Sequence, residues 1–312
     1  MSGVARAIVN SRSAVSLRKA PMLASRYRRP SDACTYRAFS VHRTMRGGTE
    51  QVGGTMPVLL GRMTQALFHA DATLTECSAT VRAITPQGII LDRTVFYPLG
   101  GGQAGDTGVL ELCSGPQAGK LITIADTRKG KDGDGRFTGD ICHVPAADEV
   151  AAGGLQVGDT VVVRLDWARR HRLMRFHTTT HLLCHLVPQL VNGCSITPEY
   201  ARLDFNMTDP LDKDTLSAGI ARLVAAALPV VVGAISDAEL DANPALVKSM
   251  SVQPPRGSGT VRTIRIGGDA LIDLQPCGGT HVANTAEIGA VVVTRIEKKS
   301  ATTRRVVLGF AA

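Results

Sequence analysis

Two short motifs, about a hundred residues apart, constrain the fold of this chain more than any other feature. They are a His-x-x-x-His run at His177–His181 and a Cys-Gly-Gly-Thr-His run at Cys277–His281. The first run lies in a predicted helix, because Asp166 is a good N-cap, apolar residues recur after it, and Pro188 ends the pattern. Histidines at positions i and i+4 leave the same face of a helix, about one turn apart. Two neutral imidazoles in this arrangement supply half of a tetrahedral zinc site.

The second run supplies a thiolate and a further imidazole. Its two glycines let the backbone adopt positive φ and fold back, so that Cys277 and His281 can approach one point. Three nitrogens and one sulfur suit zinc better than magnesium or calcium. We therefore predict one Zn²⁺ ion held by His177, His181, Cys277 and His281. The plainer alternative is a buried thiol among core histidines.

The chain is long enough for two domains, with 312 residues of which 44% are hydrophobic. Its net charge of +8 lies in residues 1–46, which hold ten Lys or Arg and a single acid, Asp32. The remaining chain has 25 basic and 26 acidic residues, so an RNA contact needs a local patch. The candidate phosphate patch consists of Lys298, Lys299, Arg304 and Arg305. A solvated sheet edge is the plainer interpretation of that cluster.

Residues 1–55 are predicted to be a basic leader followed by a linker. The leader is rich in Arg, Ser and Ala, poor in acids and without a long apolar run, which is typical of a mitochondrial transit peptide. An ordinary basic tail is the alternative. Met56 and Met63 could serve as internal starts, so we expect a mitochondrial form, a cytoplasmic form, or both.

The seven cysteines form no closely spaced framework. Without a secretory signal they indicate reduced thiols in an intracellular protein. No run of 18 apolar residues occurs, so no membrane partner is expected. The oligomeric state stays open, with a monomer as the expectation.

Residues 64–165 show short strand patterns separated by turn residues, with no helical pattern between them. The predicted strands are 72–84, 88–91, 108–112, 120–127, 136–143 and 160–165. This spacing predicts a small β-barrel domain.

Residues 166–312 mix helices and strands, which predicts an α+β domain and an α+β class for the whole chain. After the first helix, helices are expected at 211–227, capped by Asp209 with Pro210 in its first turn, and at 237–249. Strands of one sheet are expected at 229–235, 260–266, 270–274, 290–296 and 304–310.

A glycine-rich stretch interrupts the barrel domain at residues 96–108. Three glycines, at 100–102, precede Gln103, and no Gly-Lys-Ser/Thr follows, so this is not a phosphate-binding P-loop. The bare backbone would let another chain or an RNA end approach closely. The amide of Gln103 can both donate and accept hydrogen bonds, so it is a candidate for reaching over the metal site. An ordinary loop is the alternative.

These motifs together resemble those of the free-standing alanyl-tRNA editing proteins of the AlaX type, relatives of the editing domain of alanyl-tRNA synthetase. The resemblance is carried by residues 166–183, 277–289 and 201–205, and by 96–108, which is similar to the glycine-rich element of larger members. It covers roughly residues 64–312. It implies a small β-barrel followed by a zinc-binding editing domain of the threonyl/alanyl-tRNA synthetase additional-domain type, at residues 166–312. Kinship with a synthetase also brings the expectation of nucleotide and ATP binding.

The resemblance implies a hydrolase that releases a wrong amino acid from the acceptor end of tRNA(Ala), chiefly serine, with glycine as a second candidate. A pocket for alanine rejects an added hydroxyl poorly, so a second hydrolytic site is useful. His177, His181, Cys277, Gln103 and Thr178 are the expected catalytic residues, and Thr180 is a further candidate for binding the serine hydroxyl. Four protein ligands would fill a tetrahedral zinc site, so catalysis would need one to stand back or a fifth position.

Three alternatives remain at this stage. The chain could be an inactive tRNA-binding module with a structural zinc, an editing domain acting on seryl-tRNA(Thr), or an unrelated zinc hydrolase of small molecules. A metalloprotease is disfavoured, because no Glu follows His177 to act as the base.

Overall fold

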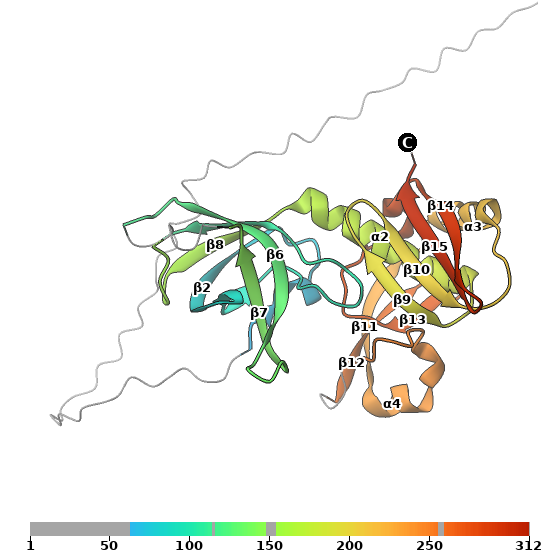
Figure 1. Cartoon of the computed structure of the whole chain (residues 1–312), viewed down its shortest axis with the longest axis horizontal. Coiled ribbons are helices and arrows are strands. Elements are labelled where there is room, and N and C mark those ends of the chain that lie inside the picture. Colours follow the sequence, from blue (N-terminus) through green and yellow to red (C-terminus); the bar gives the residue numbers. More distant parts are fainter. Residues whose placement is uncertain (1–62, 114–115, 148–153, 255–258, 312) are drawn as a thin grey trace, which may run out of the picture. The chain divides into compact units, whose positions relative to one another are not determined.

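The computed structural model describes residues 63–113, 116–147, 154–254 and 259–311, all within one compact unit, Thr49–Ala312. The predicted leader and linker at 1–55 lie outside the described residues. Within the described part, no helix is long and apolar enough to cross a membrane. The α+β class is confirmed: three α-helices accompany the strands of the described part of the chain (Figure 1).

The first half of the described chain forms a closed barrel in the order β2-β3-β7-β6-β5-β8. Its strands are β2 (Glu76–Thr85), β3 (Gly88–Leu91), β5 (Gly108–Leu112), β6 (Leu121–Lys131), β7 (Phe137–Pro145) and β8 (Thr160–Leu165). Alternate residues point inward, as along β6, where Ile122 and Ile124 are fully buried and their neighbours are exposed. A short parallel pair, β1 (Gln65–Ala66) with β4 (Arg93–Thr94), lies outside this barrel.

Helix α2 (Trp167–Leu186) follows β8 directly and carries the first histidine motif. Asp166 caps it, accepting a hydrogen bond from Arg169 N at 3.1 Å, and the helix ends just before Pro188, as predicted. Arg170 joins this helix to the barrel, because its side chain and that of Asp106 are both fully buried and form an ion pair. Isolated charges at such a depth are costly, so this pair fixes α2 against the glycine-rich stretch.

The second half contains two sheets, where the sequence predicted one. The larger has the order β14-β15-β10-β9 and the smaller the order β11-β12-β13. Their strands are β9 (Val191–Ile196), β10 (Ala201–Asn206), β11 (Val230–Ser236), β12 (Thr260–Ile266), β13 (Asp273–Pro276), β14 (Val291–Ser300) and β15 (Thr303–Phe310). The β9–β10 hairpin was missed as a pair of strands, because small and polar residues fill β9.

Two helix predictions need correction. Helix α3 (Lys213–Ala225) is capped by Asp212, whose carboxylate accepts from Thr215 N at 2.7 Å, so Asp209 and Pro210 precede it. Helix α4 (Asp237–Ala242) is shorter than expected, because Asn243 stands before Pro244 and a residue in that position is forced out of the helical conformation.

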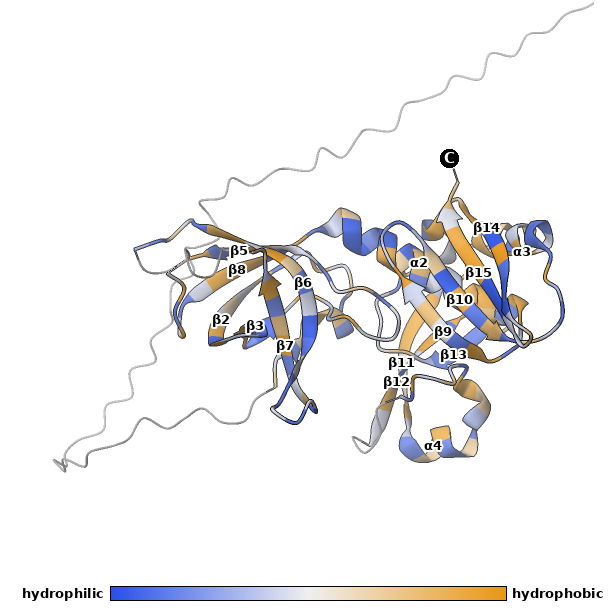
Figure 2. Ribbon diagram, in the orientation of Figure 1, coloured by the Kyte–Doolittle hydropathy of each residue, from blue (hydrophilic) through white to orange (hydrophobic). Residues whose placement is uncertain are grey.

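Two large hydrophobic clusters fill the described chain, one inside the barrel and one between α2, α3 and the larger sheet. Figure 2 shows hydrophobic residues along the strands and hydrophilic ones towards the turn of the β6–β7 hairpin. Trp167 packs against both clusters, where the predicted boundary between 64–165 and 166–312 falls. The division into two domains at this boundary stays a prediction.

Candidate metal centre

Helix α2 places His177 and His181 on a buried face. Leu173, Met174 and Phe176 on the same helix are almost fully buried in the core, which fixes the rotation of the helix about its axis. The two histidines are only 4% and 5% exposed, one helical turn apart. Their imidazoles therefore reach the interior from a rigid element.

The turn after β13 carries Cys277 and His281 to the same point. Arg262 on β12 holds this turn, because its Nη1 donates to Cys277 O at 2.6 Å and to Gly279 O at 3.1 Å. A Cβ atom at position 279 would lie 2.1 Å from the His177 ring, so only glycine allows this approach. The two motifs are thus complementary in shape.

Four ligand atoms, one each from His177, His181, Cys277 and His281, lie within 4.8 Å of one another and could hold a metal ion. Cys277 Sγ lies 3.5 Å from His177 Nε2 and 3.3 Å from His281 Nε2. A tetrahedral zinc ion, with bonds of about 2.3 Å to sulfur and about 2.1 Å to nitrogen, separates these atoms by roughly 3.6 Å. The spacing therefore fits such an ion.

Each histidine has a partner on its other ring nitrogen. His177 Nδ1 lies 2.7 Å from Gln103 Oε1, and His181 Nδ1 lies 2.7 Å from Asp273 Oδ2. His281 Nδ1 lies 3.2 Å from Thr178 Oγ1, whose own proton goes to Met174 O. All three partners act as acceptors, so all three Nδ1 atoms carry the proton and all three Nε2 atoms are free to bind a cation.

The ionisation of the cluster agrees with this assignment. Burial opposes ionisation of the Cys277 thiol, but His177 and His281 hold its pKa well below the usual range. Burial and the neighbouring His177 lower the pKa of His281 to about 3. Burial would also lower the pKa of His181, but its hydrogen bonds to Asp273 and Cys277 raise the pKa to about 10. A cation at the four atoms would replace the Nε2 proton of His181.

Gln103 lies behind His177, not over the site, which differs from the sequence expectation. Its oxygen also accepts from Thr280 N at 3.2 Å, and its amide nitrogen donates to Thr280 Oγ1 at 2.9 Å. The glycine-rich stretch is tied to β9, since Ile196 N donates to Gly102 O at 2.7 Å and a Cβ at Gly102 would collide with Cys194. Gly102 therefore packs closely against this chain, whereas Gly101 is exposed.

Thr178 and Thr180 are also engaged internally. Thr178 is fully buried beneath His281, and Thr180 Oγ1 donates to His177 O at 2.7 Å. The structure therefore brings the four predicted ligands together with Gln103 and Thr178 around them.

Three residues of this region could not be identified from any sequence motif. Asp273 has no motif around it, and its role follows only from its bond to His181. Arg262 and His69 come from separate elements, and both line a cavity of about 140 Å³ that His281 also borders. Asp71 lies on the rim of the same cavity.

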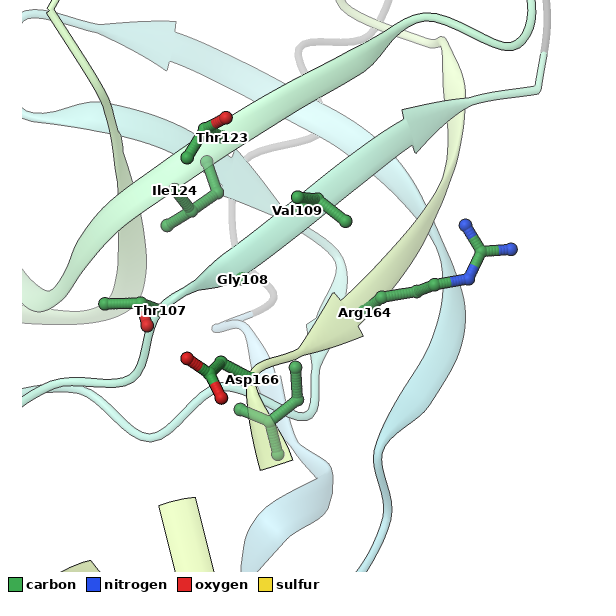
Figure 3. Close-up of a pocket in the computed structure, with 8 residues that line it drawn as sticks. Thr107, Gly108, Val109, Thr123, Ile124, Arg164 and Asp166 are labelled. Atoms are coloured by element: carbon green, nitrogen blue, oxygen red, sulfur yellow. The ribbon is translucent and has the colours of Figure 1, made fainter. Parts of the chain in front are cut away.

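A larger hollow of about 390 Å³ lies elsewhere, on the barrel surface at β5, β6 and β8 (Figure 3). Its lining includes Thr107, Ile124 and Asp166, and none of the four cluster residues. Asp166 caps α2 there, so this hollow marks the junction of barrel and helix and not the cluster.

The predicted phosphate patch is largely neutralised. Arg305 makes two hydrogen bonds to Asp204, at 2.7 and 2.9 Å, and Lys299 lies 3.8 Å from Glu297. Arg304 is 8% exposed and donates to backbone carbonyls. Only Lys298 of the four has no such contact among the described residues, so the cluster offers little free charge.

Comparison with known proteins agrees with this geometry. Residues 261–307 match the family described as the threonyl and alanyl tRNA synthetase second additional domain, and residues 54–169 match class II (A) tRNA synthetases. The chain is 33% identical to an alanyl-tRNA editing protein AlaX-M of Methanosarcina barkeri, over 78% of this chain and 97% of that protein. A Saccharolobus solfataricus protein of the same name is also 33% identical, over 78% and 98%.

An alanine–tRNA ligase of Hyperthermus butylicus is 33% identical as well, over 75% of this chain but only 24% of the ligase. The similarity to the AlaX-M proteins extends over nearly their whole length, whereas the ligase matches in one part alone. This chain belongs to the family of alanyl-tRNA editing proteins.

Proposed function

We propose that this protein hydrolyses the ester bond that joins a wrong amino acid to tRNA(Ala), chiefly serine, with glycine as a second candidate. One observation carries the proposal: the four-residue cluster with its three Nδ1 partners lies in a chain of the alanyl-tRNA editing family. Ester hydrolysis consumes only water, so the expected binding of ATP or another nucleotide has no part in it.

Zinc is the proposed ion, because one thiolate and three imidazole nitrogens are its preferred ligands. When bound, zinc would polarise the ester carbonyl and lower the pKa of an attached water towards about 7. Gln103, Asp273 and Thr178 serve as positioning residues, since each fixes the orientation of one histidine ring. Metal analysis of a His177→Ala/Cys277→Ala variant tests the assignment, and full zinc content in that variant would exclude this site.

The cavity beside His281 is the proposed place for the aminoacyl group. Its volume of about 140 Å³ is close to that of a cavity of about 150 Å³ that accepts benzene, a molecule of six heavy atoms. A seryl group has the same number of heavy atoms. Arg262 Nη1 holds the Cys277 turn, but this arginine has no carboxylate partner among the described residues and its buried Nε has no hydrogen-bond partner. Arg262 is therefore suited to the ester oxygens, and Asp71 to the ammonium group.

We expect selection against alanine to depend on the few polar groups of this cavity, among them His69, Thr73 and Arg262. A site that hydrogen-bonds a substrate hydroxyl rejects a substrate without one, because its own polar groups would be left unpaired. Since Thr178, Thr180 and Gln103 are engaged within the protein, the serine hydroxyl is expected to meet groups on the cavity wall.

The test is release of amino acid from four substrates: Ser-tRNA(Ala), Gly-tRNA(Ala), Ala-tRNA(Ala) and Ser-tRNA(Thr). We expect serine to be released from tRNA(Ala) and alanine to be spared. Equal rates on the seryl and alanyl esters would refute proofreading. Absence of release from all four would indicate a tRNA-binding module, and a preference for Ser-tRNA(Thr) would indicate editing of the threonyl type.

A further inference from the structure

The β6–β7 hairpin of the barrel ends in an unusual surface. Phe137, at the start of β7, is 64% exposed, although large aromatic side chains gain most when buried. Lys129 Nζ lies 5.3 Å and Lys131 Nζ lies 5.5 Å from the centre of its ring. Both lysines approach the same ring across an irregularity of β6 between them, and Lys131 pairs directly with Phe137 across the hairpin. We call Lys129, Lys131 and Phe137 the hairpin surface.

The positive charge of the hairpin surface is not neutralised. Neither lysine forms an ion pair with any carboxylate in the described part of the chain. The nearby acids are occupied: Asp134 pairs with Arg136, Asp140 with Arg82, and Asp132 accepts from the backbone of its own turn. Cation–π contacts leave the ammonium groups free to meet an anion.

The hairpin surface reaches the glycine-rich stretch that carries Gln103. A Cβ at Gly100 would lie 3.2 Å from Lys129 Cε, so this lysine lies along the glycine-rich stretch that carries Gln103. Lys129 therefore extends the hairpin surface along the glycine-rich stretch.

We propose that the hairpin surface binds the unpaired 3′-terminal nucleotides of the tRNA, with a base stacked on Phe137 and phosphates at Lys129 and Lys131. An exposed aromatic ring flanked by lysines is the usual platform for single-stranded nucleic acid, because every base has a face that can stack and every linkage carries a charge. This inference rests on the proposed function for the identity of the RNA. A local surface of this kind would let the protein bind RNA although residues after 46 carry no overall excess of positive charge.

The proposal predicts distinct effects for the ring and for the lysines. Phe137→Ala removes one stacked base and should weaken binding roughly five- to 150-fold, whereas Phe137→Tyr should bind like the original protein. Lys129→Ala/Lys131→Ala should reduce the slope of log affinity against log salt by about 1.4, the value for two phosphates of a single strand. Arg128→Ala is the matched control, because Arg128 is on the opposite face of β6 and pairs with Asp126.

Binding is measured by fluorescence anisotropy with the full-length protein and two RNA probes. One is a hairpin with the tRNA(Ala) acceptor-stem sequence and an unpaired 3′ end, and the other is the same hairpin with a blunt end. We expect the original protein to prefer the unpaired end and Phe137→Ala to lose that preference. Unchanged binding by Phe137→Ala, or an equal loss for both probes, would overturn the proposal.

A second readout separates this proposal from the proposed function. Hydrolysis of 3′-seryl-adenosine, which has no second base to stack on Phe137 and no phosphate, should be the same in Phe137→Ala and the original protein. A loss of that activity would make Phe137 structural and overturn the proposal. If the original protein binds the unpaired probe through Phe137 but hydrolyses no seryl ester, the proposed function fails and the hairpin surface stands.

Discussion

Replacement of Asp273 by Asn tests how the cluster is built. Asp273 is 5% exposed, and its carboxylate accepts from His181 Nδ1 at 2.7 Å and from Gln275 Nε2 at 2.9 and 3.0 Å. Asparagine has nearly the same shape, so the core packing is kept while the negative charge is lost. Without that charge, the imidazole of His181 becomes a weaker base and a weaker ligand.

The expected loss of zinc affinity follows from the position of Asp273, which contacts the ligand His181 and not the ion itself. Loss of such a partner typically lowers metal affinity about 10- to 100-fold, equivalent to roughly 1.4–2.7 kcal/mol. The dissociation constant for zinc is measured by competition with a chelator for the original protein, Asp273→Asn and Asp204→Asn. Asp204 is a suitable control, because it is a partly buried carboxylate bound to Arg305 and Arg202, away from the cluster.

We expect a weakened zinc affinity in Asp273→Asn and none of this effect in Asp204→Asn. An unchanged dissociation constant in Asp273→Asn would refute the assigned role of the carboxylate. An equal loss in both variants would attribute the change to general destabilisation.

Three further predictions follow from the same structure. Gln103→Ala should lower both zinc affinity and seryl-ester hydrolysis, because His177 loses its Nδ1 acceptor. Unchanged values in both chelator competition and deacylation assays would make the glycine-rich stretch merely structural. Burial lowers the pKa of His143 to about 4, so the unfolded chain binds the proton more readily than the folded chain. The free energy of unfolding should therefore be highest above pH 6.5 and fall by about 3 kcal/mol as the pH drops to 4. Denaturant titrations should show this loss in the original protein and not in His143→Gln. Residues 1–55 fused to a fluorescent reporter should direct it to mitochondria, and an even cytosolic signal would contradict the predicted leader.

The ligands of the metal cluster could be predicted from sequence because their spacing encodes geometry. His177 and His181 are one helical turn apart, and the Cys277–His281 turn can approach them because Gly279 has no Cβ to collide with the His177 ring. The expected positive φ is found at neither Gly278 nor Gly279, so these glycines matter for close approach and not for a left-handed backbone. The cap at Asp166 and the stop at Pro188 likewise act through local chemistry, so the bounds of α2 were predictable.

What could not be predicted depends on contacts between distant segments. Asp273 meets His181 across 92 residues and Gln103 meets Thr280 across 177 residues, and no local pattern records either pairing. The start of α3 was missed for a related reason, since Asp209 and Asp212 are both good caps and only the fold selects one. The neutralisation of Arg305 could not be predicted either, because it depends on the position of Asp204 on the neighbouring strand.

The most direct test of the central claim compares serine release from Ser-tRNA(Ala) and zinc content in the same samples of the original protein and Cys277→Ala. Cys277 Sγ is the only sulfur of the four ligand atoms, and it lies within 3.5 Å of two histidine nitrogens. We predict that the original protein binds one zinc ion per chain and releases serine, and that Cys277→Ala loses both properties while remaining folded by circular dichroism. Release of serine at the original rate by Cys277→Ala, or full zinc content in that variant, would contradict the account.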